Sequence, residues 1–181
     1  DVSNTAPGQT GGTVQVLGDK VGLLGALINA SGTSGGGTVL IGGDYKGQGT
    51  VPNASRTYIS NNSAITADSL LDGNGGRVIA WADEVTTFYG NISARGGSEA
   101  GDGGFVEVSG KQNLIFDGTV DVSASNGNLG TLLLDPTDII ISNERNTGAV
   151  NAALPDIFQG DLAGGITINA TTLQDQTGNV V

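Results

Sequence analysis

Apolar and polar residues alternate in short runs along the chain, and a glycine precedes the first run of each repeated unit. Within residues 75–110, Val78 and Ala80 fall on one face of an expected strand at a period of two. Arg77 and Ile79 fall on the other face, where the apolar Ile79 is an exception to the alternation. The pattern predicts half-buried β-strands separated by glycine-rich corners.

The unit recurs along the chain. Its leading glycines are separated by 25, 39, 28 and 26 residues and are Gly12, Gly37, Gly76, Gly104 and Gly130. Two inward positions follow each glycine and form a ladder of Val14 and Val16, Val39 and Ile41, Val78 and Ala80, Val106 and Val108, and Leu132 and Leu134. A second ladder pairs Ile28 with Ala30, Ile92 with Ala94 and Val120 with Val122. Periods of about 20–50 residues indicate a solenoid, a propeller or an array.

Among these architectures, an all-β parallel β-helix fits best. A propeller blade would be longer, at about 40–45 residues, and would carry an aromatic signature that this chain lacks. The frame of leucine-rich repeats is also missing. We therefore expect five to six coils, each with two or three short strands, stacked about 4.8 Å apart.

We expect one β-helix segment over residues 1–181. It divides into a lead-in (1–10), repeat coils (11–142), and an irregular segment with a final partial coil (143–181). An outward loop, Asp44–Thr57, interrupts the second coil, and a short helix is expected near 149–159. The last coil is expected to be open at its end. Because the chain begins at Asp1 without a leader sequence, we interpret it as a piece of a longer exoprotein.

Charge and composition narrow the classes of partner. The formal net charge of −11 and the lack of a basic stripe argue against nucleic acid and anionic lipid. No apolar run is long enough for membrane insertion. Cysteine is absent, so the sequence offers no disulfide. The few aromatic residues suit a narrow interior filled by Val, Ile, Leu and Ala.

Histidine and cysteine are both absent, which excludes Ser-His-Asp and Cys-His catalysis and zinc fingers. Only carboxylates remain as candidates for chemistry, and they are scattered: Asp83 and Glu84, Asp135 and Asp138, with Glu107 and Asp121 at outward positions. We interpret them as surface acids, and we expect no enzyme, no cofactor and no resident metal. A single poor match to a calcium nonapeptide, at 97–105, leaves calcium at carboxylate corners an open alternative.

Aromatic residues supply a candidate contact surface. Tyr45 and Lys46 in the loop, with Arg56 and Tyr58 at its end, form the predicted contact loop. Trp81, with Phe88 and Tyr89 nearby, either stacks on sugars or is shielded at a corner or under the loop; we favour the shielded interpretation.

Four stretches together resemble the large secreted exoproteins of the filamentous haemagglutinin family, particularly those of cyanobacteria and proteobacteria. They are GGTVLIGGDYKGQG (36–49), GGRVIAWADEVTTFYGNISARGG (75–97), GDGGFVEVSGK (101–111) and GTLLLDPTDIIIS (130–142). The resemblance implies a right-handed β-helix that is secreted through an outer-membrane partner of a two-partner system. It also implies a location at the cell surface, in an adhesin, filament or coat.

These observations predict a structural and adhesive segment that acts as a stiff rod. Its expected partners are neighbouring repeats or copies of itself end to end, the outer-membrane secretion partner, and host or matrix glycans or proteins. Two alternatives remain. One is a self-assembling filament subunit, and the other is a carbohydrate-active β-helix enzyme that uses acids such as Asp83.

Overall fold

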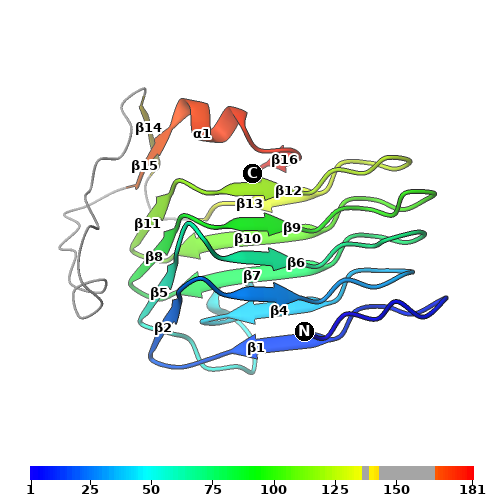
Figure 1. Cartoon of the computed structure of the whole chain (residues 1–181). Helices are drawn as coiled ribbons and strands as arrows, with labels where there is room; N and C mark the ends of the chain where they lie inside the picture. The colour runs from blue at the N-terminus through cyan, green and yellow to red at the C-terminus, as the bar shows by residue number, and fades with distance from the viewer. Residues whose placement is uncertain (136–138, 143–165) are drawn as a thin grey trace.

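A computed structural model describes residues 1–135, 139–142 and 166–181. The chain winds into stacked coils, and the first four coils each contribute one short strand to each of three parallel sheets (Figure 1). The predicted all-β parallel solenoid is confirmed. The strands of the coils are β1 (Thr13–Val16), β2 (Lys20–Leu23), β3 (Leu27–Asn29), β4 (Thr38–Ile41), β5 (Arg56–Ile59), β6 (Ala64–Thr66), β7 (Arg77–Ala82), β8 (Val85–Phe88), β9 (Asn91–Ser93), β10 (Phe105–Gly110), β11 (Asn113–Phe116), β12 (Thr119–Asp121) and β13 (Thr131–Leu133).

Within the coils, each strand pairs with the strand three positions later in the chain, which is its counterpart in the next coil. The largest sheet has the order β1-β4-β7-β10-β13-β16, and two four-stranded sheets have the orders β11-β8-β5-β2 and β12-β9-β6-β3. The register places Val14, Val39, Val78, Val106 and Leu132 in one column and Val16, Ile41, Ala80 and Val108 in another. Leu134 directly follows β13 and is buried.

The interior of the coils is a continuous apolar column. The third sheet adds a column of Ile28, Ile65, Ile92 and Val120, in which Ile65 is a member that the sequence pattern did not single out. Phe88 and Phe116 lie inside as well, with stacked rings whose centroids are 5.3 Å apart. Residues at equivalent positions therefore pack on one another from coil to coil, as expected for a solenoid.

Two buried threonines show how the interior accepts polar groups. Thr57 and Thr86 occupy equivalent positions in β5 and β8. The Thr57 hydroxyl donates to the carbonyl of Trp81 and the Thr86 hydroxyl to that of Ser109, each at 2.7 Å. Because each hydroxyl has a partner, neither burial carries the penalty of an unpaired polar group.

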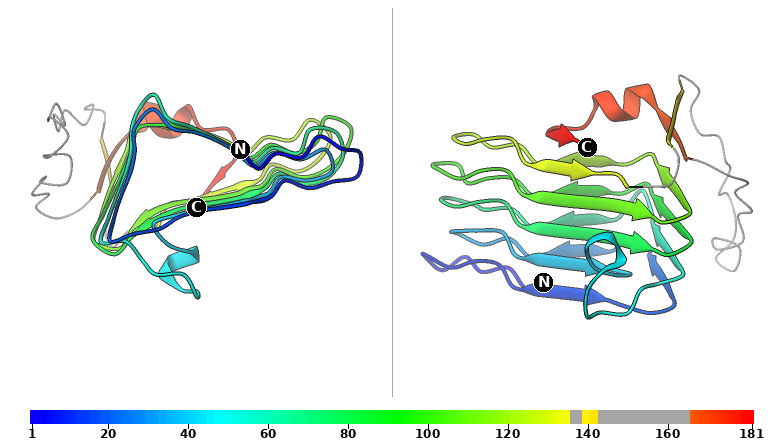
Figure 2. Two further views of the ribbon diagram at one scale, coloured as in Figure 1. Left: turned by 60° about the horizontal axis from the view of Figure 1, so that its bottom comes forward. Right: turned by 180° about the vertical axis from the view of Figure 1, so that it is seen from behind.

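Long arms connect the end of each coil to the next, and the three arms with double glycines cover residues 31–36, 68–75 and 95–103. They stack on one another along one corner (Figure 2). A backbone hydrogen bond closes the base of each of these arms: Gly37 donates to Ala30, Gly76 to Ala67 and Gly104 to Ala94, each at 2.7 Å. We call these the arm-base hydrogen bonds.

The double glycine is explained by these bonds. The second glycine donates the bond, and the first lies against the bond of the following coil. A Cβ on Gly75 would lie 2.0 Å from the carbonyl oxygen of Ala94 and 2.6 Å from the amide nitrogen of Gly104. These backbone atoms form the arm-base hydrogen bond itself, so they cannot move aside without breaking it.

At the C-terminal end the largest sheet keeps the expected unpaired edge, but Leu173 packs against the interior. Here β14 (Ile139–Ser142) pairs with β15 (Ile166–Asn169), α1 (Ala170–Gln174) follows, and β16 (Asn179–Val180) joins the largest sheet beside β13. Leu173 packs against the core, and the Gln176 side chain accepts the Val120 amide at 2.6 Å. The expected helix near 149–159 lies outside the described residues. Among those residues, no helix is long and apolar enough to cross a membrane.

Replacing Gly75 by Ala should destabilise the fold by about 3 kcal/mol, because the added methyl overlaps backbone atoms of the next coil. Urea unfolding followed by circular dichroism measures the loss. The matched control is Gly18→Ala, whose Cβ would meet only the carbonyl oxygen of Lys20, at 3.7 Å. The control should change stability by no more than about 0.5 kcal/mol. Equal losses in the two variants would contradict the role of the arm-base hydrogen bond.

Candidate contact site beneath the insertion

The insertion of the second coil folds back over the outer face of the largest sheet (Figure 2). It contains a short 3-10 turn, η1 (Tyr45–Gly47), which starts where the Asp44 carboxylate accepts the Tyr45 amide at 2.7 Å. Beneath it, Leu40, Ile79 and Trp81 form a second apolar cluster on the outside of the sheet, separate from the interior. The sequence signal for this cover was Ile79, the apolar residue on the expected polar face.

Charged contacts hold the insertion in place. Arg77 donates to the Asp44 carboxylate at 2.5 Å, and the Lys46 ammonium lies 3.1 Å from the Asp135 carboxylate. The Lys46 amide donates to both carboxylate oxygens of Glu107, at 3.1 and 3.2 Å. Lys46 thus contacts two successive coils beyond its own, one through its backbone and one through its side chain.

Glu107 corrects the prediction of an ordinary surface acid. It points outward from β10 as the alternation predicts, but the insertion covers it so fully that its exposed fraction is 0%. Burial raises the pKa of its carboxyl above the usual value of 4.5, while hydrogen bonds from the Lys46 amide and the Ser109 side chain oppose that rise. The sequence could not show this, because the covering residue lies 61 positions away.

A groove of about 520 Å³ opens between the insertion and the ends of three strands of the largest sheet. Its lining is polar apart from Gly47 and one aromatic ring, and consists of Lys46, Gly47, Gln48, Asn53, Trp81, Asp83, Lys111 and Asp135. Asp83 and Lys111 directly follow β7 and β10, and Asp135 lies two residues after β13. Negative, positive and negative side chains therefore follow one another across three successive coils.

Asp83 is fixed at the wall of this groove. Its Oδ1 accepts from the Asn53 amide group and from the Trp81 indole N–H, each at 3.2 Å. Trp81 is buried, and a Cβ on Gly47 would lie 2.7 Å from its ring. Of the two interpretations of Trp81, the structure therefore supports the one that places it under the loop.

The predicted contact residues separate into two groups. Tyr45 and Lys46 belong to η1, and Tyr45 makes an edge contact with Phe105 at 5.8 Å between ring centroids. Arg56 and Tyr58 lie in β5, in another sheet, where Arg56 pairs with Glu84 at 3.0 Å. The groove is the feature that the sequence did not predict, because its walls come from four coils.

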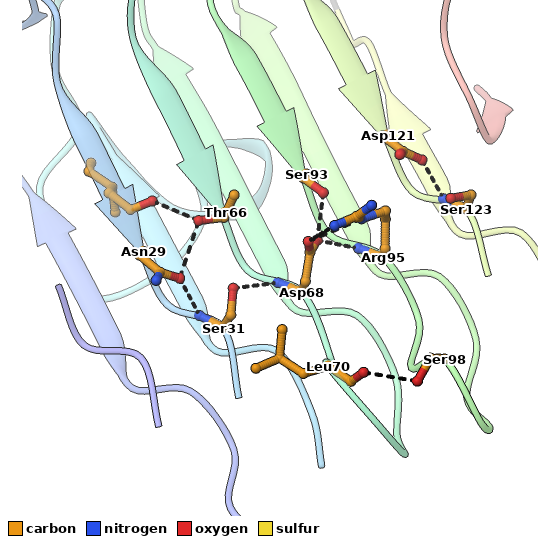
Figure 3. A network of polar contacts seen from close by, with 11 residues as sticks. Asn29, Ser31, Thr66, Asp68, Leu70, Ser93, Arg95, Ser98, Asp121 and Ser123 are labelled. Carbon is orange, nitrogen blue, oxygen red and sulfur yellow. Dashed lines mark hydrogen bonds and ion pairs between the residues drawn. The ribbon is translucent and has the colours of Figure 1, made fainter. Parts of the chain in front are cut away.

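A second polar cluster lies where the third sheet meets the arms (Figure 3). The Asp68 carboxylate is almost fully buried and accepts four bonds from two residues of the next coil. Ser93 donates its hydroxyl at 2.6 Å, and Arg95 donates its amide at 2.8 Å and its guanidinium at 2.7 and 3.1 Å. With both oxygens of the carboxylate engaged, this cluster joins coils and leaves no acceptor for chemistry.

The candidate carboxylates are not all separate, because Glu107 lies close enough to Asp135 for their charges to interact. Asp83 and Asp135 both line the groove, whereas Glu84 pairs with Arg56 outside it. Asp138 lies outside the described residues. Across 1–135 and the two later described ranges, no three acids form a group that could hold a metal ion.

Comparison with known proteins leaves the family open. No protein-family model matches the chain, and no curated protein matches it. The resemblance to the filamentous haemagglutinin family therefore stays a prediction.

Glu107→Gln should remove one component of the pH dependence of stability. The folded protein holds the Glu107 proton more tightly than the unfolded chain, so its free energy of unfolding falls as pH rises from 4.5 through the raised pKa. Above that pKa, ionised Glu107 is a constant cost, which the glutamine variant does not carry. Relative to the natural protein, the variant should gain stability across this window in urea unfolding at pH 4 to 8.

The control for this experiment is Glu99→Gln, at an exposed glutamate on an arm. Its pH profile should follow that of the natural protein. If Glu107→Gln also follows that profile, the carboxyl is not buried in the folded protein as described.

Asp68→Asn should destabilise the fold by about 2 kcal/mol, because all four bonds that Ser93 and Arg95 donate lose a charged acceptor. Chemical unfolding measures the change, with Asp72→Asn as the matched control. Asp72 is exposed on an arm and accepts one hydroxyl bond from Ser34, so its loss should be no more than about 0.5 kcal/mol. Equal stability of the two variants would refute the inter-coil role of Asp68.

Proposed function

We propose that this protein is a structural and adhesive segment of a secreted bacterial cell-surface exoprotein of the filamentous haemagglutinin type. In this proposal it is a right-handed β-helix of five to six coils, the hand that nearly all crossover connections between parallel strands adopt. It is exported through an outer-membrane secretion partner and serves as a stiff rod that carries contact surfaces. It is not an enzyme and needs no cofactor.

One observation supports this proposal above the others, namely the unbroken column of inward residues in the largest sheet. Val39, Val78 and Val106 are in register, and the interior around them is apolar and buried. Each coil is bonded chiefly to its neighbours, so stability grows with the number of coils. Such a scaffold suits an extended surface protein, and the sequence resemblance supports the same interpretation.

A filament subunit that stacks end to end is the second candidate. At the N-terminal end, β1 and β2 are edge strands of their sheets, and unpaired edges favour strand addition. The opposite end weighs against it, because Leu173 packs against the core there. Two exposed coil ends would be needed for a head-to-tail filament.

The adhesive function predicts that beads coated with this chain are retained under flow on surfaces coated with bacterial matrix polysaccharide or matrix protein. Beads coated with an inert acidic protein of similar size are the control, because the net charge of −11 alone favours neither surface. Retention equal to that of the control beads on every surface would overturn the proposal. Release of new reducing or unsaturated ends from the polysaccharide, lost in Asp83→Ala, would establish an enzyme instead.

A further inference from the structure

We propose that the groove beneath the insertion binds a neutral, hydroxyl-rich saccharide unit. This inference rests on the proposed adhesive function and assigns its contact point. The groove is formed by segments far apart in sequence, namely η1, Asn53 and the strand ends that carry Asp83, Lys111 and Asp135. Its volume of about 520 Å³ lies within the range of about 300–1,000 Å³ in which proteins bind small ligands.

The side chains around the groove are suited to hydroxyl groups. Two carboxylates accept O–H bonds, two lysines donate, and the amides of Gln48 and Asn53 can do both. The Asp83 carboxylate is already oriented, because both of its protein donors reach Oδ1. A rigid acceptor of this kind loses little conformational entropy when it binds a ligand.

The balance of charge selects a neutral ligand. Two of the three lysines in the whole chain line this groove, and two aspartates offset them. A phosphate or a polyanion would meet no excess of positive charge here, and the molecule as a whole carries −11. Charged groups with zero net charge instead make strong hydrogen bonds to uncharged hydroxyls.

The Trp81 ring lines the groove but is buried, so it offers little surface to a sugar. Gly47 lies against the ring of Trp81, and the indole N–H is bonded to Asp83. A sugar is therefore held by hydrogen bonds along the groove, and we expect weak affinity for a single unit. Multiple copies on one surface would strengthen attachment through avidity.

Trp81 is the only tryptophan in the chain, so its fluorescence reports directly on the groove. The intact chain is titrated with soluble neutral oligosaccharides of glucose, of galactose and of mannose, and with a hexuronate oligomer of the same length. At least one neutral series should give a saturable change in fluorescence and saturation transfer to its protons in NMR. The hexuronate oligomer should bind more weakly.

Lys111→Ala and Gln48→Ala test the groove on two of its sides, and each should weaken binding, by about tenfold for the lysine. Lys20→Ala is the matched control, because Lys20 is an exposed lysine at the N-terminal edge of the second sheet. Its affinity should equal that of the natural protein. Circular dichroism must show that all three variants are folded, and Gln48→Ala keeps the test valid if Lys111→Ala unfolds.

Three results would overturn the inference. The first is the absence of both signals with every neutral oligosaccharide at concentrations up to about 10 mM. A Kd of that size corresponds to a binding free energy of only about −3 kcal/mol. The second is tighter binding of the hexuronate oligomer, and the third is unchanged affinity in folded groove variants. If bead retention persists in any of these cases, the adhesive function stands and only its assignment to this groove fails.

Discussion

The arm-base hydrogen bond is the contact on which the geometry of this molecule depends. It brings the end of one coil to within 2.7 Å of the start of the next, between backbone atoms with no side chain in the way. Gly76 donates one such bond, and the preceding Gly75 lies against the bond of the following coil. Because each bond is packed against its neighbour, a single side chain at either glycine disturbs two coils at once. The double glycines of the sequence thus have a structural cause.

A closed arm base keeps the cross-section of the coils constant and leaves the segments outside it free to vary. The arms differ in length, and one coil accepts an insertion, yet the register of Val39 on Val78 is maintained. This separation explains how the same chain combines a uniform interior with a local, irregular groove. The insertion needs its own apolar cluster because it packs on the outer face, and Leu40, Ile79 and Trp81 supply it.

The repeated strands and their inward ladder could be predicted from the sequence. The features that occur only once, such as the insertion groove, could not. The ladder could be aligned because the same apolar pattern follows each leading glycine, although the coils differ in length. The apolar Ile79 on the polar face indicated the face that the insertion covers. Alternation predicts a surface acid at Glu107 because it reports only the side of a strand, whereas burial depends on what lies over that side. The groove and the cover at Leu173 also join residues from distant coils, and no local pattern encodes such contacts.

Two local costs coincide at the insertion. Lys46 has a φ of 54°, which residues with a side chain seldom adopt, and its amide donates to Glu107, a carboxylate withdrawn from water. Neither feature is needed for the stacking of the coils, because the neighbouring coils stack in the same way and have no insertion. Backbone strain and a buried charge persist where the surrounding structure holds them, and they gather at binding sites. Here they fix the residue whose ammonium reaches Asp135 across the groove. The strained backbone of Lys46 and the buried Glu107 therefore help to define the shape of the surface proposed to bind.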